Sequence, residues 1–243
     1  VPTRRSSELF WQAAGIVVGM KYESFQARVA LRTYEDLAPA IDRMRHGEAD
    51  VLWPGRCAFF AVSSGTTAGS TKHLPVTEEM LAHFRQAGLD SLLYYTVREK
   101  HAGVFRGRHL FLGGSTALTP IAEASPHEAY AGDLSGITAL NLPGWVEKYL
   151  YEPGSAIAQM TDWPAKLDAI VARTSDLDIT LLAGIPSWVL ILATALRERS
   201  SEGKQRITNL QGLWPNLECF VHGGVPIGPF QQELRTALGP TVK

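Results

Sequence analysis

The sequence is poor in cysteine, with only Cys57 and Cys219 among its 243 residues, and these two lie far apart along the chain. Two such residues cannot form the framework of a disulfide-rich fold, and they show no metal-ligand spacing. We therefore expect two buried free thiols, which is the usual state of cysteine in a reducing cytoplasm.

An excess of charge of one sign is also lacking, since the formal net charge at pH 7 is -1. This balance excludes the electrostatic footprint of nucleic-acid binding or of attachment to anionic lipid. The first five residues lack the basic, apolar and small-residue order of a secretory signal peptide. These absences predict a cytoplasmic protein whose partners include neither nucleic acid nor membrane.

Long uninterrupted apolar stretches are absent as well. Residues 179–196 carry no charge and nearly reach the length that spans a bilayer, but Gly184 and Pro186 interrupt them. We interpret residues 179–183 as a buried strand, and we expect Pro186 to open a buried helix over residues 187–199. A transmembrane helix is the alternative interpretation.

Segments typical of strands and of helices alternate along the chain. This order favours an α/β fold, a wound and mostly parallel sheet flanked by helices. Thr33 and Asp36 match a capping box at a helix start. The expected strands cover residues 57–62, 109–112, 179–183 and 217–221. The expected helices cover residues 6–18, 33–46, 143–151, 162–173, 187–199 and 229–238, and a further long helix begins at Thr77.

The most informative segment is Ser-Ser-Gly-Thr-Thr-Ala-Gly-Ser-Thr-Lys, residues 63–72, which we expect to join a strand to the helix that begins at Thr77. Glycines let the backbone approach a ligand closely, and successive N–H groups in such a turn form an anion site. The hydroxyl groups add donors, and Lys72 supplies a point charge for phosphate oxygens. The composition therefore suits a polyphosphate, although a plain Ser/Gly-rich surface loop remains the alternative.

Two common nucleotide motifs do not fit this segment. Gly65 and Gly69 are one residue too close together for a Walker A motif, and Lys72 does not directly follow Gly69. The dinucleotide fingerprint Gly-x-Gly-x-x-Gly is absent from the loop.

A different pattern matches residues 63–72. They resemble the phosphate loop of the acyl-adenylate-forming superfamily. They are more similar still to the Ser-Ser-Gly-Thr-Thr-x-Gly-x-x-Lys variant of the auxin-responsive (Gretchen Hagen three) acyl acid amido synthetase family, because the wider superfamily has one residue fewer before the lysine. Weaker similarities, several of them to the bacterial branch of that family, cover residues 29–37, 131–137, 183–188 and 213–224.

The resemblance implies an ATP-dependent ligase. Such an enzyme activates a small carboxylic acid as an acyl-adenylate and transfers the acyl group to an amine, usually that of an amino acid. The resemblance places the ATP phosphates at Ser63, Ser64, Gly65, Thr66, Thr67, Gly69 and Lys72. It also implies Mg²⁺ bridging phosphate oxygens, although the sequence offers no convincing metal-binding carboxylate and assigns no catalytic residue.

A second glycine-rich turn follows the expected strand at 217–221. The resemblance implies that Gly223, Gly224 and Val225 shape the adenine side of the nucleotide site. The alternative is a strand-to-helix turn that needs glycine for a positive φ. His222 fits a capping or packed histidine better than a catalytic one.

A third candidate lies where the expected strand at 179–183 gives way to a helix. Open α/β sheets bind ligands outside the carboxyl ends of their strands. Ile185, Ser187 and Trp188 are therefore candidates for an acyl pocket, and a core tryptophan is the alternative for Trp188. Asp133 and Ser135 are weaker candidates, because Gly132–Asp133 can form a simple turn.

Two other functions compete with the ligase. In a serine hydrolase, Gly113–Ala117 would be the nucleophile elbow and His222–Gly224 the oxyanion turn, but Ala117 replaces the second glycine and the order of the two motifs is reversed. A non-catalytic nucleotide-binding module would share the phosphate loop.

The extent of the resemblance adds an expectation about completeness. The family places an acidic motif, a ribose-binding motif and a mobile carboxyl-terminal domain after the segments that are similar here. We therefore expect residues 1–243 to form an amino-terminal ATP- and acyl-binding domain that is partial, lacks the carboxyl-terminal domain and is inactive by itself.

Overall fold

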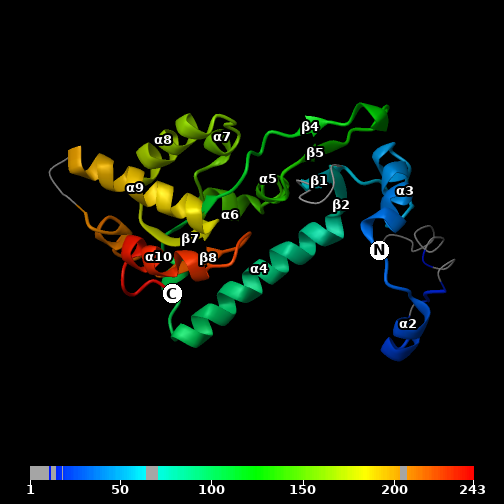
Figure 1. Cartoon of the computed structure of the whole chain (residues 1–243), viewed down its shortest axis with the longest axis horizontal. Coiled ribbons are helices and arrows are strands. Elements are labelled where there is room, and N and C mark those ends of the chain that lie inside the picture. The colour runs from blue at the N-terminus through cyan, green and yellow to red at the C-terminus, as the bar shows by residue number, and fades with distance from the viewer. Residues whose placement is uncertain (1–10, 12–14, 18, 64–70, 203–206) are drawn as a thin grey trace. The chain divides into compact units, whose positions relative to one another are not determined.

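The computed structural model describes residues 11, 15–17, 19–63, 71–202 and 207–243. The chain divides into two compact units, of which unit 1 comprises Val1–Ala82 and Leu118–Ile137. Unit 2 comprises His83–Ala117 and Thr138–Lys243. Each unit contains a four-stranded sheet of its own, and Figure 1 labels the strands. The expected α/β class with parallel strands and flanking helices is confirmed, but the sequence did not reveal that the strands divide into two sheets.

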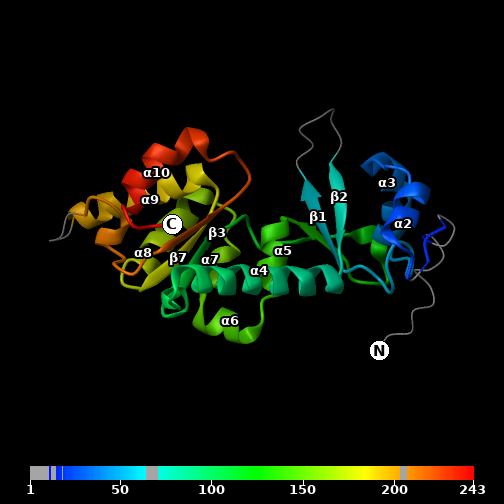
Figure 2. The same ribbon diagram turned by 90° about the horizontal axis from the view of Figure 1, so that it is seen from below.

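The sheet of unit 1 is mixed. It has the strand order β2-β1-β5-β4, in which β1 pairs antiparallel with β2 and parallel with β5. Figure 2 shows β1 and β2 side by side. The strands are β1 (Phe59–Ser63), β2 (Lys72–Val76), β4 (Thr119–Pro120) and β5 (Tyr130–Gly132).

The strand β2 corrects one expectation. Residues 63–72 do not lead directly into a helix, because Lys72–Val76 returns antiparallel to β1 before the helix begins. The segment Lys-His-Leu-Pro-Val gave no clear strand signal, since Pro75 cannot donate to a ladder and is tolerated only on an edge strand such as this one.

The helix starts that the sequence predicted near this sheet are confirmed. The Thr33 backbone N–H donates to the Asp36 carboxylate at 2.6 Å, and the Met80 N–H donates to the Thr77 hydroxyl at 3.2 Å. The helices of unit 1 are α2 (Tyr22–Arg28), α3 (Tyr34–Arg45) and η2 (Ala122–Ala124), and α4 (Glu78–Glu99) and α5 (Leu134–Leu140) each have residues in both units. The helix expected at residues 6–18 falls mostly outside the described residues, and residues 15–17 are not helical.

The core of unit 1 lies between α3 and the sheet. Ile41 and Met44 of α3 pack with Phe60 of β1, whose side chain is completely buried. A smaller cluster joins Ala61 and Val76 to Leu81 and Ile137. Neighbouring residues of β1 thus pack into different clusters, whereas the edge strand β2 buries only Val76.

The sheet of unit 2 is parallel throughout, in the order β6-β3-β7-β8. The strands are β3 (Arg108–Leu112), β6 (Tyr151–Glu152), β7 (Ile179–Gly184) and β8 (Cys219–His222). The chain passes from β3 to β6 on one side and then places β7 on the other side of β3. The direction of winding therefore reverses between β3 and β7, which is where open α/β sheets form a ligand crevice.

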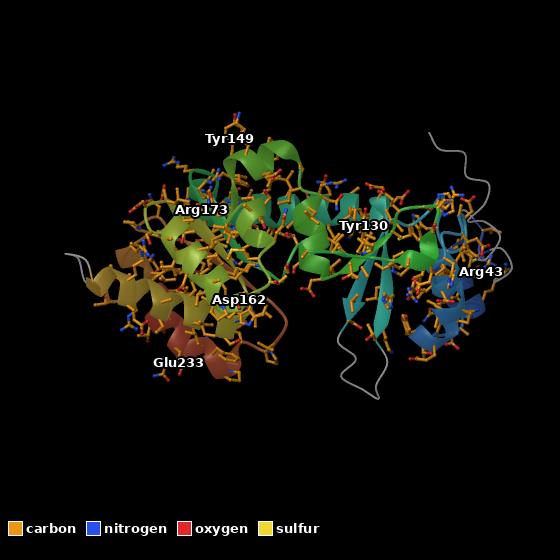
Figure 3. The ribbon with its side chains drawn as sticks, turned by 90° about the horizontal axis from the view of Figure 1, so that it is seen from above. Arg43, Tyr130, Tyr149, Asp162, Arg173 and Glu233 are labelled. Carbon is orange, nitrogen blue, oxygen red and sulfur yellow. The ribbon has the colours of Figure 1, made fainter. Side chains whose placement is uncertain are left out.

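Helices and short turns complete unit 2. They are η1 (Gly103–Phe105), α6 (Gly144–Tyr149), α7 (Ser155–Ala158), α8 (Trp163–Thr174), α9 (Pro186–Glu202), η3 (Leu210–Gly212), η4 (Gly228–Phe230) and α10 (Gln231–Leu238). The Asp162 carboxylate accepts the Ala165 N–H at 2.9 Å, which confirms the predicted start of α8. Figure 3 shows Asp162 at the start of α8 and Arg173 near its end.

Residues 179–196 do not form a transmembrane helix. They divide between β7 and α9 at Ile185, where the glycine and proline of the sequence interrupt the apolar run. Within the part of the chain that the structure describes, every helix is too short or too polar to cross a bilayer.

Both faces of the parallel sheet are covered. Leu182 belongs to a large cluster with α8, α9 and α10, whereas its neighbour Leu181 packs with Tyr95 and Cys219. Successive strand residues point to opposite faces, so the apolar run of β7 needs a cover on each side. Trp214 is completely buried in the larger cluster, and its indole N–H donates to the Thr174 carbonyl at 2.9 Å.

A buried carboxylate fixes the outer strand β6. The Glu152 side chain is 0% exposed and forms ion pairs with Arg108 of β3 and Arg173 of α8, each at 2.6 Å. Hydrogen bonds to Glu152 raise the pKa of the Arg173 guanidinium further above its usual range. The pairing compensates a negative charge that would otherwise be costly to bury, and it ties β6 to a neighbouring strand and a helix.

Candidate functional site

The ends of the candidate phosphate loop lie at the end of β1 and the start of β2, which form a hairpin. Ser63, the last residue of β1, and Lys72, the first residue of β2, are cross-strand partners. The predicted phosphate-binding residues Ser64, Gly65, Thr66, Thr67 and Gly69 lie outside the described residues, so their roles stay predictions. The described geometry brings Ser63 and Lys72 together at the base of this loop.

Lys72 has two neighbours on α3. Its ammonium lies 3.0 Å from a carboxylate oxygen of Glu35 and 4.9 Å from the centre of the Tyr34 ring. A groove beside this pair is lined by residues of α3 and of β2, among them Asp42, Arg45 and His73. Sequence reasoning missed these neighbours, because Glu35 and Lys72 are far apart in sequence and no local pattern joins them.

His73 in this groove is a weak base. Burial is the main cause that lowers the pKa of its imidazole, and the positive charge of Arg45 lowers it further. The lowered pKa favours the neutral form of His73, so this histidine adds little positive charge beside Lys72. The cation at the base of the candidate loop is Lys72.

The predicted adenine-side residues form a turn after β8. Gly224 has φ +81°, and a Cβ added there would lie 3.4 Å from the Ile185 side chain. Gly223 has open space around a Cβ position, and Val225 is exposed. His222 is exposed and its ring lies 5.7 Å from that of Phe220, and its assignment as a capping or packed histidine stays a prediction.

The predicted acyl-pocket residues lie at the carboxyl end of the neighbouring strand β7. Gly184 of β7 is the register partner of His222 of β8, so Ile185 follows β7 next to the Gly224 turn. Ser187 is half-buried in the first turn of α9. Trp188 packs against the large core cluster, with its ring 4.9 Å from that of Trp163. The structure thus brings the second and third candidates together. It leaves Trp188 half-buried beside the core cluster, so its role in an acyl pocket stays a prediction.

A buried lysine supports the carboxyl end of β3, on the other side of β7. Lys166 of α8 is 5% exposed, and its ammonium donates to the carbonyl oxygens of Gly114 at 3.1 Å and of Ala158 at 3.0 Å. Close by in the chain, the Thr116 hydroxyl is buried and has no hydrogen-bond partner among the described residues. Sequence reasoning missed Lys166, because a helical lysine usually faces solvent. It missed Thr116 because no local pattern marks a buried hydroxyl.

Ser115, the candidate nucleophile of a serine hydrolase, has an ordinary turn environment. Its hydroxyl donates to the Gln159 carbonyl at 3.3 Å and accepts the Ala117 N–H at 3.0 Å. These are backbone partners of the kind that stabilise a turn. They give no support to the hydrolase alternative.

Comparison with known families identifies the family of this chain. Residues 15–242 match the family model described as the GH3 family N-terminal domain. The chain belongs to the GH3 family. This is the family that the phosphate loop resembles, and the match extends over nearly all of the chain.

Curated relatives of this GH3 chain are plant proteins. It is 37% identical over 90 residues to the probable indole-3-acetic acid-amido synthetase GH3.2 of Oryza sativa subsp. japonica, covering 37% of this chain and 14% of the relative. It is 33% identical over 125 residues to the jasmonoyl-L-amino acid synthetase GH3.3 of the same plant, covering 47% of this chain and 26% of that protein.

A solved structure shares the fold. The acyl acid amido synthetase AtGH3.15, in complex with 2,4-DB, has a TM-score of 0.66 and 19% sequence identity to this GH3 chain. The similarity covers 98% of this chain and 48% of the AtGH3.15 chain. The chain therefore spans about half the length of its solved structural relative, which has an adenylate-forming fold.

The two cysteines of the GH3 chain are free and buried, as predicted. Burial is the main cause that raises the pKa of the Cys219 thiol to about 11, and burial likewise raises the pKa of Cys57. Both are therefore inert thiols at neutral pH. Among the residues that the structure describes, no three His, Cys, Asp or Glu side chains gather where they could hold a metal ion.

Proposed function

We propose that the protein acts in an ATP-dependent, adenylate-forming ligase that activates a small carboxylic acid and transfers it to an amine. The observation that carries this proposal is the match of residues 15–242 to the GH3 family, whose relatives are named as amido synthetases. Within the matched residues, the sequence Ser-Ser-Gly-Thr-Thr-x-Gly-x-x-Lys at residues 63–72 supports the use of ATP.

The proposed reaction has two halves. A carboxylate oxygen of the acid attacks the α-phosphorus of ATP, and pyrophosphate leaves. The amine nitrogen then attacks the carbonyl carbon of the acyl-adenylate, AMP leaves with the bonding electron pair, and the nitrogen loses a proton. The first half needs no covalent enzyme nucleophile, so positioning and charge neutralisation carry most of the catalysis.

The proposal assigns a role to each group of candidate residues. Ser63, Ser64, Gly65, Thr66, Thr67, Gly69 and Lys72 hold the phosphates, through backbone N–H groups, hydroxyls and the ammonium. Gly223, Gly224 and Val225 contact the adenine, and Ile185, Ser187 and Trp188 line the acyl pocket. The carboxyl ends of β7 and β8, which carry the last two groups, are adjacent in one parallel sheet, and this supports their assignment. Mg²⁺ neutralises phosphate charge when bound, but its ligands stay unassigned.

The test is acid-dependent ATP–pyrophosphate exchange, measured with the full-length protein over a panel of carboxylic acids. The proposal predicts exchange of labelled pyrophosphate into ATP only when a suitable acid is present, because the acid is the nucleophile. ATP binding without exchange for any acid would favour the alternative of a non-catalytic nucleotide-binding module.

Three narrower statements stay predictions within this proposal. They are membership of the bacterial branch, a location in the cytoplasm, and the inactivity of residues 1–243 by themselves. Running the same exchange assay on residues 1–243 tests the last of them, and robust exchange there would contradict it.

A further inference from the structure

The first turn of α3 is fixed to the strand that begins with Lys72, and Figure 2 shows α3 next to β2. The Tyr34 hydroxyl accepts the backbone N–H of His73 at 3.0 Å and donates to the His73 carbonyl oxygen at 3.3 Å. Because β2 is an edge strand, the hydroxyl occupies the place that a further strand would otherwise take. Tyr34 and Glu35 are thereby held close to Lys72.

Glu35 carries the negative charge that faces Lys72. The pKa of its carboxyl is lowered, first by a hydrogen bond from its own backbone N–H and then by Lys72 and Thr33. The Glu35 side chain is 68% exposed, whereas that of Lys72 is 33% exposed. The carboxylate can therefore turn into water while the lysine stays partly covered.

We propose that Glu35 is an exchangeable counter-ion of Lys72, which a phosphate group of the bound nucleotide displaces. This inference rests on the proposed function of residues 63–72. In the free protein Glu35 neutralises and orients the ammonium, and in the bound protein the phosphate takes its place. Glu35 acts through Lys72 and is a positioning residue.

The chemistry of the pair favours exchange over a permanent ion pair. An exposed lysine–carboxylate pair adds little to stability, so it is easily given up. A phosphate group carries more negative charge and more acceptor oxygens than a carboxylate. If the Glu35 carboxylate stayed 3.0 Å from the ammonium, it would repel the incoming phosphate. The released carboxylate stays in the first turn of α3, where the helix amino terminus stabilises negative charge.

Tyr34 keeps its role in both states. Its ring lies 4.9 Å from the Lys72 ammonium, a distance at which a cation and an aromatic face attract each other. The hydroxyl of the same residue is bound to the backbone of β2, so the ring does not follow Glu35 when it turns away. The ammonium therefore remains at the base of the loop after its counter-ion has changed.

The experiment is calorimetry of ATP and of pyrophosphate with the full-length protein and its variants. Glu35→Gln removes the competing charge, and we expect both ligands to bind about two- to fivefold more tightly, which is the scale of one exposed ion pair. Glu79→Gln makes the same change of charge in the first turn of another helix, α4, and is expected to leave binding unchanged. Glu35→Gln made in a Lys72→Met background is expected to have no effect, because the counter-ion then has no partner.

The outcomes separate the two proposals. If the wild type binds both ligands and Glu35→Gln binds them equally or more weakly, the exchange is wrong and the phosphate loop stands. If Glu35→Gln increases ligand affinity equally in the Lys72→Met background, the exchange is also contradicted, because the effect would then not depend on the lysine. If the wild type binds neither ligand, the proposed function of the loop fails, and the exchange fails with it. The melting temperature of each variant shows that the fold is intact.

Discussion

The two sheets of this GH3 chain bury their strands to different extents. In β7 of the parallel sheet the first four residues are buried, whereas in β2 of the hairpin only Val76 is. The parallel sheet is covered on both faces, and its carboxyl edge carries glycine turns. The hairpin strand β2 is mostly half-buried or exposed, and its first residue, Lys72, lies beside Glu35 and Tyr34. The more deeply buried strand and the proposed charged ligand contacts therefore lie in different sheets.

The difference in burial between the two sheets is tested most directly by truncating one leucine in each. Leu182 of β7 is completely buried, and Leu182→Ala is expected to lower the free energy of unfolding by about 2–5 kcal/mol, because it removes apolar contacts and leaves a cavity. Leu74 of β2 is 43% exposed, and Leu74→Ala is expected to stay within about 0.5 kcal/mol. Urea unfolding measures both losses, and equal losses would show that β2 is packed as tightly as β7.

A glycine pair sharpens the comparison within the parallel sheet. A Cβ at Gly184 would lie 2.9 Å from the Leu112 Cβ, so Gly184→Ala is expected to cost about 1–3 kcal/mol through overpacking. At Gly223 nothing lies within 4 Å of a Cβ and φ is not positive, so a side chain fits the free protein.

The proposed adenine contact gives Gly223 a distinct expectation. Gly223→Val should melt like the wild type and bind ATP at least tenfold more weakly, with unchanged pyrophosphate affinity, because the new side chain would meet only the base. Calorimetry and thermal melting separate the two effects. Equal weakening of ATP and pyrophosphate would speak against the adenine assignment.

Acid stability distinguishes a buried histidine of the parallel sheet from one of the hairpin. His109 of β3 is 2% exposed, and its Nε2–H donates to the Val104 carbonyl at 2.8 Å. Burial is the main cause that lowers its pKa below the ordinary 6.5. As the pH falls below 6.5, the imidazole of the unfolded chain binds a proton more readily than that of the folded chain. The contribution of His109 to stability is therefore present above pH 6.5 and is lost as the pH falls below it.

The corresponding measurement is urea unfolding between pH 8 and pH 5. His109→Gln is expected to flatten the decline of stability with falling pH, whatever its effect at pH 8. His73→Gln is the matched variant in the hairpin. The pKa of this imidazole is also lowered, but the side chain is only half-buried, so the variant is expected to flatten the decline less. A steeper decline in His109→Gln than in the wild type would contradict this reading.

The sequence predicted the parallel sheet better than the mixed one, for a physical reason. A strand buried on both faces must be apolar throughout, so residues 179–183 and 109–112 were recognisable. The strand β2 contains lysine, histidine and proline, and β4 and β5 have only two and three residues. Their pairing depends on distant partners, and no local pattern records it.

The candidate site was predictable where its residues are contiguous. The phosphate-loop motif led directly to Lys72, because its residues follow one another in the chain. Glu35 and Tyr34 escaped notice, since only the fold brings α3 against β2. Lys166 escaped for another reason, because its burial depends on hydrogen bonds to two carbonyl oxygens that belong to separate segments.

The phenol of Tyr34 has a consequence for the behaviour of the protein at high concentration. An open strand edge is a template on which a second molecule can add its own strand, and such contacts propagate into insoluble assemblies. At His73 both the N–H and the carbonyl of this edge are already engaged by a single side-chain hydroxyl. We therefore expect Tyr34→Phe, which keeps the aromatic ring but loses both hydrogen bonds, to leave this edge more open to association.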